Sequence, residues 1–359
     1  MGAPSGVTSI AVADVREWAR IIGGRLWFGG LLALGVLSLG IVVGSTQISM
    51  GRLLAALTGA IAGHLEGQTA LDWYILSAVR APRVLVAALV GGGLAMGGAA
   101  LQALFRNPLA DPGVLGVSSG AALSAVVAIN FGWAAVSSLA LPVAAFVGAG
   151  AASLLVMRMA AREGRLSLAT ILLAGIAVNA LCGAGVSAVI TFARRYEALR
   201  DIVFWMMGGL DARSWQHVAM VLPAAAVGTA GLMALARDLN VLSLGTHEAQ
   251  GLGVDVGRTR WAVLALVALL AGAAVSVAGV IGFVGLVVPH ILRLLLGPDN
   301  RRLLPASLLG GATFLVLADL VARTMARPVE LRVGLVTSLV GGPFFLFLLH
   351  RHRARIEAS

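Results

Sequence analysis

Residues 80–121 read RAPRVLVAALVGGGLAMGGAALQALFRNPLADPGVLGVSSGA, and this stretch decides the fold. Its run 84–105 carries no charged residue and can cross a bilayer as a helix, which takes about 20 mostly apolar residues. Gly93 and Gly97 lie four positions apart, so they place small residues on one helix face, where a neighbouring helix can approach closely. The Asn-Pro pair at 107–108 stops the helix. The stretch therefore predicts a membrane-spanning helix, a tight turn and a second helix.

The rest of the chain repeats this pattern. Of its 359 residues, 59% are hydrophobic and 12% charged, and its mean hydropathy of +0.96 is far above that of a water-soluble domain. The predicted spans are 26–43, 84–105, 114–130, 136–159, 168–192, 218–236, 261–280, 283–296, 303–322 and 333–349. The predicted fold class is therefore an all-α polytopic membrane protein with about ten transmembrane helices.

A single transmembrane domain is predicted at residues 26–350. The polar segment 1–25 precedes it and the tail 351–359 follows it, and both are expected to be cytoplasmic. The run 26–43 is longer than the hydrophobic region of a signal peptide and ends without a small-x-small cleavage site, so we expect it to be retained. In this orientation 16 of the 26 arginines lie inside and ten outside, as the positive-inside rule requires.

Arginine supplies all 26 basic residues. Because a P-loop needs its lysine to hold phosphates, we predict a transport subunit without its own ATPase site. His247 and Glu248 begin a zinc-protease pattern, but Gly251 stands where the second histidine is required, so no metal site is predicted. An ion-coupled secondary transporter is the alternative from a different class. Such proteins place ionisable groups at mid-membrane depth, and the centres of these ten runs lack them.

Four segments together resemble the FecCD-type permease family of ABC importers, which carry ferric siderophores, haem or cobalamin. They are residues 80–121, LNVLSLG at 239–245 with LGV at 252–254, GVIGFVGLVVPHILR at 279–293, and GGPFF at 341–345. The resemblance implies the cobalamin-permease (type II importer) fold in a bacterial inner membrane. It also implies a second copy of the chain, two cytoplasmic ATPase subunits that bind ATP and Mg, and a periplasmic substrate-binding protein. This chain itself would bind no cofactor and no nucleic acid.

By the same resemblance, Arg80, Arg83 and Arg323 would pair with glutamates on the two lobes of the binding protein. Arginine suits this role because its planar fork meets a carboxylate through two hydrogen bonds. The alternative is that these arginines extend to lipid headgroups. Asp319 lies four residues before Arg323 and could hold it by an i,i+4 pair, which would make Arg323 partly structural.

The resemblance also assigns the cytoplasmic end. Asn107 and Leu109 would form one part of the gate, and Ser167, Leu168 and Ala169 would form the other. The cobalamin members carry small hydroxyl residues at the positions of Leu168 and Ala169, so the gate of this chain should be more apolar. The segment 238–258 would form the coupling helices that fit a groove of the ATPase, although a plain loop has a similar composition. Its predicted coupling residues are Leu242, Leu244, Gly245, Glu248, Ala249, Leu252 and Gly253.

The ligand is the least specified part of the prediction. The run DPGVLGVSSG at 111–120 is closer to haem-type members, so haem is the first choice, ferric siderophore the second and cobalamin the third. Many members carry proline where this chain has Arg332. That arginine either enlarges the docking surface or meets ligand carboxylates at the outer mouth, and both interpretations stay open.

Overall fold

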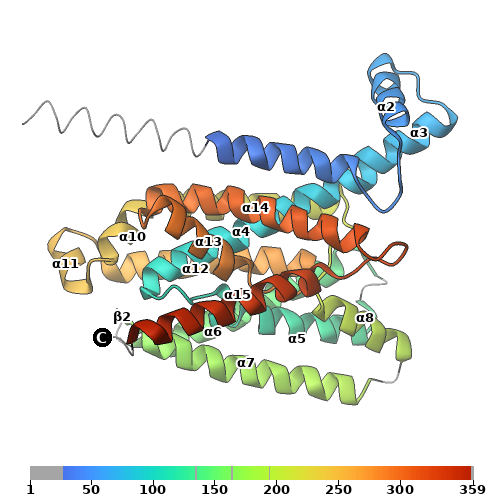
Figure 1. Ribbon diagram of the computed structural model, residues 1–359. Coiled ribbons are helices and arrows are strands. Elements are labelled where there is room, and N and C mark those ends of the chain that lie inside the picture. Colours follow the sequence, from blue (N-terminus) through green and yellow to red (C-terminus); the bar gives the residue numbers. More distant parts are fainter. Residues whose placement is uncertain (1–26, 134–135, 163–164, 194, 357–359) are drawn as a thin grey trace, which may run out of the picture.

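The computed structural model describes the protein apart from residues 1–26, 134–135, 163–164, 194 and 357–359. The predicted segment 1–25 and the end of the predicted tail lie outside the described residues. Figure 1 shows a bundle whose helices run roughly parallel to one long axis. We call the end where α4 (Ala81–Phe105) begins the outer end and the end where it finishes the inner end, after the predicted orientation.

Each of the ten predicted spans contains a helix. Besides α4, these are the first helix (Trp27–Val42), α5 (Val117–Asn130), α6 (Ala140–Ala160), α7 (Leu168–Thr191), α9 (Trp215–Ala234), α12 (Val256–Ala278), α13 (Val284–Leu296), α14 (Asn300–Thr324) and α15 (Val333–Ile356). Among the described residues, six helices are long and apolar enough to cross a membrane, and five apolar helices are shorter. The all-α membrane fold is therefore confirmed.

Several short elements lie at the two ends of the bundle (Figure 1), and of these only the helices α10 and α11, in the predicted coupling segment 238–258, were expected. At the outer end are α2 (Met50–Ala62), α3 (Gly67–Tyr74) and α8 (Tyr196–Met206); at the inner end are α10 (Ala236–Leu242), α11 (Thr246–Gly251), the 3-10 turn η2 (Pro112–Leu115) and the strands β1 (Ala161–Arg162) and β2 (Arg165–Leu166). The two strands pair antiparallel. These elements are too short or too polar to register as membrane spans.

The helix that contains α4 begins much earlier than residue 84. It is continuous over Gly67–Phe105, and the π-helical turn η1 (Ile75–Arg80) joins α3 to α4. The predicted span 84–105, which leaves Arg80 and Arg83 ahead of the helix, therefore begins too late, because charged residues at the outer end do not interrupt the helix. A π turn inserts one extra residue, and this one ends two residues before Pro82, which cannot donate a backbone hydrogen bond.

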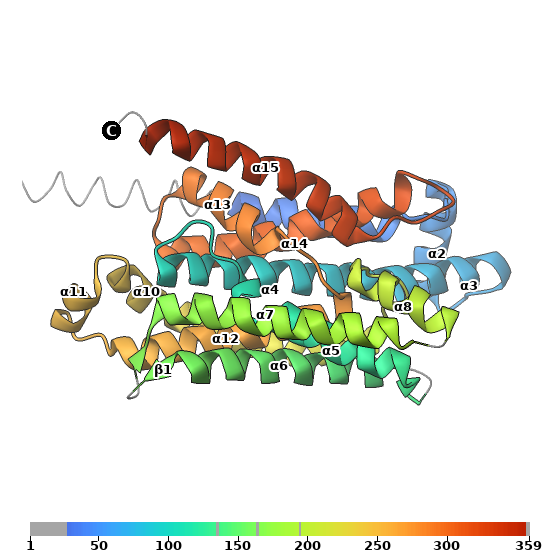
Figure 2. The ribbon, with the colours of Figure 1, turned by 90° about the horizontal axis from the view of Figure 1, so that it is seen from below.

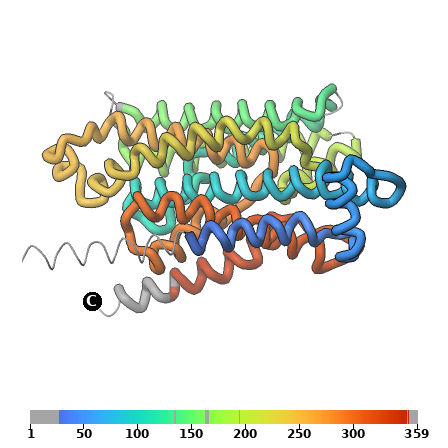
Figure 3. Tube along the Cα trace, turned by 90° about the horizontal axis from the view of Figure 1, so that it is seen from above, coloured from blue at the N-terminus to red at the C-terminus, as the bar shows by residue number. Residues whose placement is uncertain are grey.

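Helix α4 is the centre of the bundle. It packs against α14, α12 and α13, and nearly all of its residues are buried. Figures 2 and 3 agree that the first helix, α13, α14 and α15 lie on one side of α4 and that α6, α7 and α12 lie on the other. A helix buried on all sides needs no polar stripe, which is why 84–105 shows no amphipathic period.

Two glycine contacts bring α4 backbone to backbone with its neighbours. A Cβ at Gly91 would overlap the carbonyl of Gly311 in α14, and a Cβ at Gly98 would overlap the carbonyl of Gly285 in α13. Gly93 and Gly97 instead face Leu270 and Val267 of α12 at ordinary van der Waals distances, 3.6 and 3.4 Å from the Cβ positions. The closest approach therefore uses other glycines than the pair singled out in the sequence.

Helices α12 and α13 run in opposite directions along α4 and are joined by the irregular segment 279–283. α12 ends at Gly279, with φ 69°, and α13 begins after Phe283, with φ 68°. The residues between them are not helical, and Ile281 among them is buried. Irregular backbone at membrane depth is tolerated where protein covers it. Because Gly285 already lies beside Gly98, α13 accompanies only the inner part of α4.

We predict that Gly98→Ala lowers the stability of the permease by about 1–3 kcal/mol, the usual cost of overpacking. The measurement is the midpoint of thermal unfolding in detergent. Gly150→Ala is the matched control, because Gly150 lies mid-helix in α6 with open space around its Cβ position. Equal unfolding midpoints for the two variants would show that the backbones of α4 and α13 are not in close contact at Gly98.

Candidate functional site

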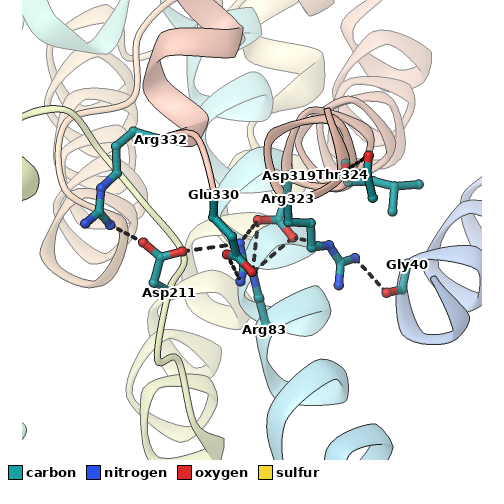
Figure 4. A network of polar contacts seen from close by, with 9 residues as sticks. Gly40, Arg83, Asp211, Asp319, Arg323, Thr324, Glu330 and Arg332 are labelled. Carbon is teal, nitrogen blue, oxygen red and sulfur yellow. Dashed lines mark hydrogen bonds and ion pairs between the residues drawn. The ribbon is translucent and has the colours of Figure 1, made fainter. Parts of the chain in front are cut away.

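A buried ion network joins the outer ends of α4 and α14 (Figure 4). Nη2 of Arg83 lies 2.8 Å from Oδ1 of Asp319, and Nε of Arg83 lies 3.0 Å from the same oxygen, so the guanidinium meets the carboxylate with its fork. Nη1 of Arg83 donates to Oε2 of Glu330 at 2.8 Å. Asp319 is fully buried and also lies 3.3 Å from Nε of Arg323, the i,i+4 pair considered in the sequence.

The network continues into the loop before α9. Asp211 lies 3.3 Å from Nη2 of Arg83 and accepts a hydrogen bond from Nη1 of Arg332. The guanidinium of Arg332 also lies over the ring of Phe204, 4.4 Å from its centroid. Three arginines thus face three carboxylates, which compensates the charges of groups that are largely removed from water.

A second set of arginines holds the outer end of the first helix. Arg80 donates to the carbonyls of Val42 and Thr46, each at 2.5 Å, and Arg323 donates to the carbonyl of Gly40 at 2.6 Å. Arg327 donates to the carbonyl of Gly44 at 2.5 Å. The last carbonyls of a helix lack intrahelical donors and carry partial negative charge, so the bonds to Gly40 and Val42 cap it, while those to Gly44 and Thr46 hold the segment that follows.

The charged groups around this network have shifted pKa values. Burial raises the pKa of Asp211 despite the nearby Arg83 and Arg332. For Glu330, burial alone would raise the pKa, but the hydrogen bond and charge of Arg83 hold the pKa below its usual value. Burial lowers the pKa of Arg213 to about 10. Of Asp211 and Glu330, the carboxylate that accepts a hydrogen bond from Arg83, Glu330, is thus the one that stays ionised more readily.

The three predicted docking residues lie inside the subunit. Arg80, Arg83 and Arg323 are 4%, 9% and 2% exposed, and each is bonded to its own chain. Their docking role stays a prediction, and their internal contacts give each of them a structural role as well. Arg332 lines an outer cavity of about 410 Å³ together with Arg195, Arg213 and Phe204, so it is placed to meet either ligand or partner.

The predicted gate residues sit in two turns at the inner end. The side chain of Asn107 accepts a hydrogen bond from the backbone N–H of Leu109 at 2.9 Å, which fixes the turn after α4. Ser167 caps α7 through the N–H of Thr170 at 3.3 Å, and Leu168 and Ala169 form its first turn. These side chains are exposed or half-buried at the inner end.

Asn179 is a candidate that the sequence reasoning missed. Its Oδ1 accepts from the hydroxyl of Ser119 at 2.6 Å, and its Nδ2 lies 3.4 Å from the carbonyl of Gly113. It therefore ties α7 to α5 and to the turn that follows the gate residue Leu109. The available signal was a lone amide in an otherwise apolar span, which usually marks an interhelical contact.

The coupling segment folds as α10 and α11. Leu242 and Ala249 are buried, whereas Leu244 and Leu252 are 65% and 63% exposed. The predicted coupling residues Gly245, Glu248 and Gly253 lie around α11. Exposed leucines beyond the inner end of a membrane bundle are typical of a contact surface.

Two side chains connect this segment to the bundle. Oδ1 of Asn240 accepts from the backbone N–H of Asn300 at 2.8 Å, at the start of α14. Arg260 donates to the hydroxyl of Thr246 at 3.1 Å and to the carbonyl of Leu166 at 3.0 Å, next to the gate residue Ser167. The segment is therefore bonded both to α14 and to the turn that precedes α7.

Within the described ranges, no three His, Cys, Asp or Glu side chains gather closely enough to hold a metal ion. The ionisable groups concentrate at the two ends of the bundle, while the described helices between them carry apolar and small side chains.

Residues 31–351 match the FecCD transport family. The hemin transport system permease protein HmuU of Yersinia pestis is 48% identical over 288 residues, which cover 78% of this chain and 84% of that protein. The cobalamin import system permease protein BtuC of Halobacterium salinarum is 46% identical over 309 residues, 86% and 82% of the two chains. A solved inward-facing structure of a metal-chelate type ABC transporter is similar with a TM-score of 0.81 and 31% identity, covering 92% of this chain and 99% of that chain.

We predict that Asp319→Asn destabilises the subunit by about 3–5 kcal/mol, because it leaves two buried guanidiniums without their shared carboxylate. Thermal unfolding in detergent measures this. Asp201→Asn is the control, since the Asp201 side chain is 56% exposed and its nearest arginine nitrogen, on Arg200, is 3.8 Å away. An Asp319→Asn variant as stable as Asp201→Asn would refute the structural role of the network.

Proposed function

Because the chain belongs to the FecCD transport family and is a permease subunit of an ABC importer, we propose that its cargo is haem or a related iron chelate. The cargo would move from the periplasm to the cytoplasm of a bacterial cell, across the inner membrane, with both termini cytoplasmic. The observation that carries the proposal is the family match over nearly the whole bundle, together with 48% identity to a permease named for hemin transport. Cobalamin and ferric siderophore are the alternatives, since a cobalamin permease is 46% identical.

The proposed working assembly contains two copies of this chain, two ATPase subunits and a periplasmic binding protein. Absence of lysine from the sequence supports an external ATPase, because the chain cannot form an ordinary P-loop. We place ATP and Mg on that partner and no cofactor on this chain. The exposed Leu244 and Leu252 support ATPase docking at α10 and α11.

We propose that the outer end receives the binding protein near Arg80, Arg83 and Arg323. Each of these guanidiniums already has a carboxylate or carbonyl partner, so direct pairing with a glutamate of the binding protein would require an exchange of partners. Such an exchange would loosen the first helix or the α4–α14 pair as docking proceeds. The outer network would then respond to the binding protein as well as hold the fold.

Transport would follow from movement at the inner end. ATP binding closes the ATPase dimer and displaces the segment 238–258, and the bonds of Asn240 and Arg260 pass this displacement to α14 and to the turn before Ser167. The gate formed by Asn107, Leu109, Ser167, Leu168 and Ala169 then changes its opening. A pathway without a strong ligand site releases a large amphipathic cargo quickly, because tight binding would slow its dissociation. A cargo that binds both conformations equally also leaves the equilibrium between them unchanged.

Reconstitution in liposomes tests the function. With the cognate ATPase and binding protein, we expect haem uptake that requires ATP and stops when the ATPase is omitted. Uptake driven by an ion gradient without the ATPase would contradict the proposal. Preference of the binding protein for cobalamin or a ferric siderophore over haem would overturn the proposed cargo and leave the importer assignment intact.

The coupling surface has its own test. The double variant Leu244→Asp, Leu252→Asp should weaken association with the ATPase by at least about tenfold, since buried apolar anchors dominate such interfaces. Binding of the ATPase to the permease in nanodiscs measures this. Arg200→Gln is the control, because its side chain is 61% exposed in α8 at the opposite, outer end of the bundle. Equal ATPase binding by wild type and the double variant would remove α10 and α11 from the interface.

A further inference from the structure

An apolar groove lies between the first helix, α13 and α14. Its volume is about 620 Å³, and among the described residues that line it only Thr313 has a polar side chain. The hydroxyl of Thr313 donates to the carbonyl of Leu309 at 2.8 Å, so its hydrogen bond is made within α14. The groove therefore offers apolar surface alone, which neither a polar solute nor a charged peptide would fill favourably.

Missing side chains create part of this space. Gly29 belongs to the groove wall, and a Cβ at this position would meet nothing within 4 Å. On the opposite wall, the Cβ position of Gly310 lies 2.9 Å from a methyl carbon of Leu292, so this glycine lets α13 lie close to α14. The groove is open to the surroundings at Phe28, Leu32 and Leu295, which are 69%, 51% and 63% exposed. On a membrane protein such a surface faces lipid.

One arginine continues the α14 wall beyond its inner edge. Ala306, Gly310, Thr313 and Leu317 line the groove at helical spacing, and Arg302 lies one turn before Ala306 on the same helix face. The Arg302 side chain is 38% exposed, and the oxygen of its ion-pair partner Asp299 is 3.8 Å from Nε, which is beyond hydrogen-bond distance. Arg301 precedes it in the first turn of α14 and is also exposed.

We infer that the groove is a binding site for an anionic phospholipid, with an acyl chain between the first helix, α13 and α14 and the phosphate on Arg302. Guanidinium is suited to phosphate because its planar fork donates two hydrogen bonds to two oxygens. The groove wall runs along the bundle from the α13–α14 turn, as an acyl chain runs from its headgroup into the membrane. Basic groups at the ends of grooves between transmembrane helices are the arrangement that recognises anionic headgroups.

The experiment uses the full permease purified in detergent and incubated with phosphatidylglycerol or phosphatidylcholine at equal concentration. Native mass spectrometry counts the lipids retained. For the wild type we expect phosphatidylglycerol to be retained preferentially. Arg302→Gln should lower this preference by about fivefold, the contribution of one arginine near an anionic surface. It should leave phosphatidylcholine retention unchanged.

Gly29→Leu tests the acyl-chain part of the site. It fills the groove from the first helix without displacing a neighbour, so retention of both lipids should fall. Gly35→Leu is the matched control, because Gly35 lies in the same helix, also has open space and is not part of the groove. Unchanged lipid retention in Gly29→Leu, or equal retention of the two lipids by the wild type, would overturn the inference. A change of oligomeric state in Gly29→Leu alone would also overturn it and identify the groove as a contact between copies.

Discussion

The contact of the α4 backbone with α14 and α13 is the constraint on which the other features depend. Lipid tails are as apolar as leucine, so helices within a bilayer gain little from burying apolar surface against one another. Their association depends on many close dispersion contacts, and these require backbones to approach. Gly91 against Gly311 and Gly98 against Gly285 provide that approach. Once α4 is fixed in this way, α12 and α14 pack around it, and protein covers the irregular segment that joins α12 to α13.

The outer and inner ends of the bundle are held by different kinds of interaction. At the outer end, Asp319 fixes α14 against Arg83 of α4, and arginines cap the first helix. Desolvation offsets most of the attraction within a buried ion pair, but separating the partners is costly because it leaves uncompensated buried charges. At the inner end the connections are neutral or singly charged hydrogen bonds, such as that of Arg260 to the carbonyl of Leu166 and those of Asn240 to Asn300. The inner end can thus be rearranged at a much lower cost, which agrees with a gate and a coupling surface there.

The sequence contained enough to predict the spans, because long uncharged runs and Asn-Pro turns are local signals. It did not contain the outward continuation of α4 to Gly67, since a helix outside the bilayer needs no apolar run. Nor could it pair Arg83 with Asp319 and Glu330, which lie 236 and 247 positions away. The sequence identified the outer arginines as charged residues near the ends of spans. Whether each guanidinium points to a partner protein or into its own subunit depends on these distant contacts. By contrast, the i,i+4 pair of Asp319 and Arg323 was predictable, because helix geometry alone brings its members together.

The two paths from the proposed coupling segment 238–258 to the proposed gate differ in stiffness. Asn240 is bonded to the first residue of α14, and α14 is packed along α4 and tied to it at the outer end, so a displacement there must move or tilt the pair as a unit. Arg260 reaches Leu166 through one hydrogen bond to a short hairpin, and Ser167 begins α7 directly afterwards. Motion along this second path needs only the breaking of contacts such as those of Asn179, which join α7 to the turn after α4. The gate side formed by Ser167, Leu168 and Ala169 should therefore move before the side formed by Asn107 and Leu109.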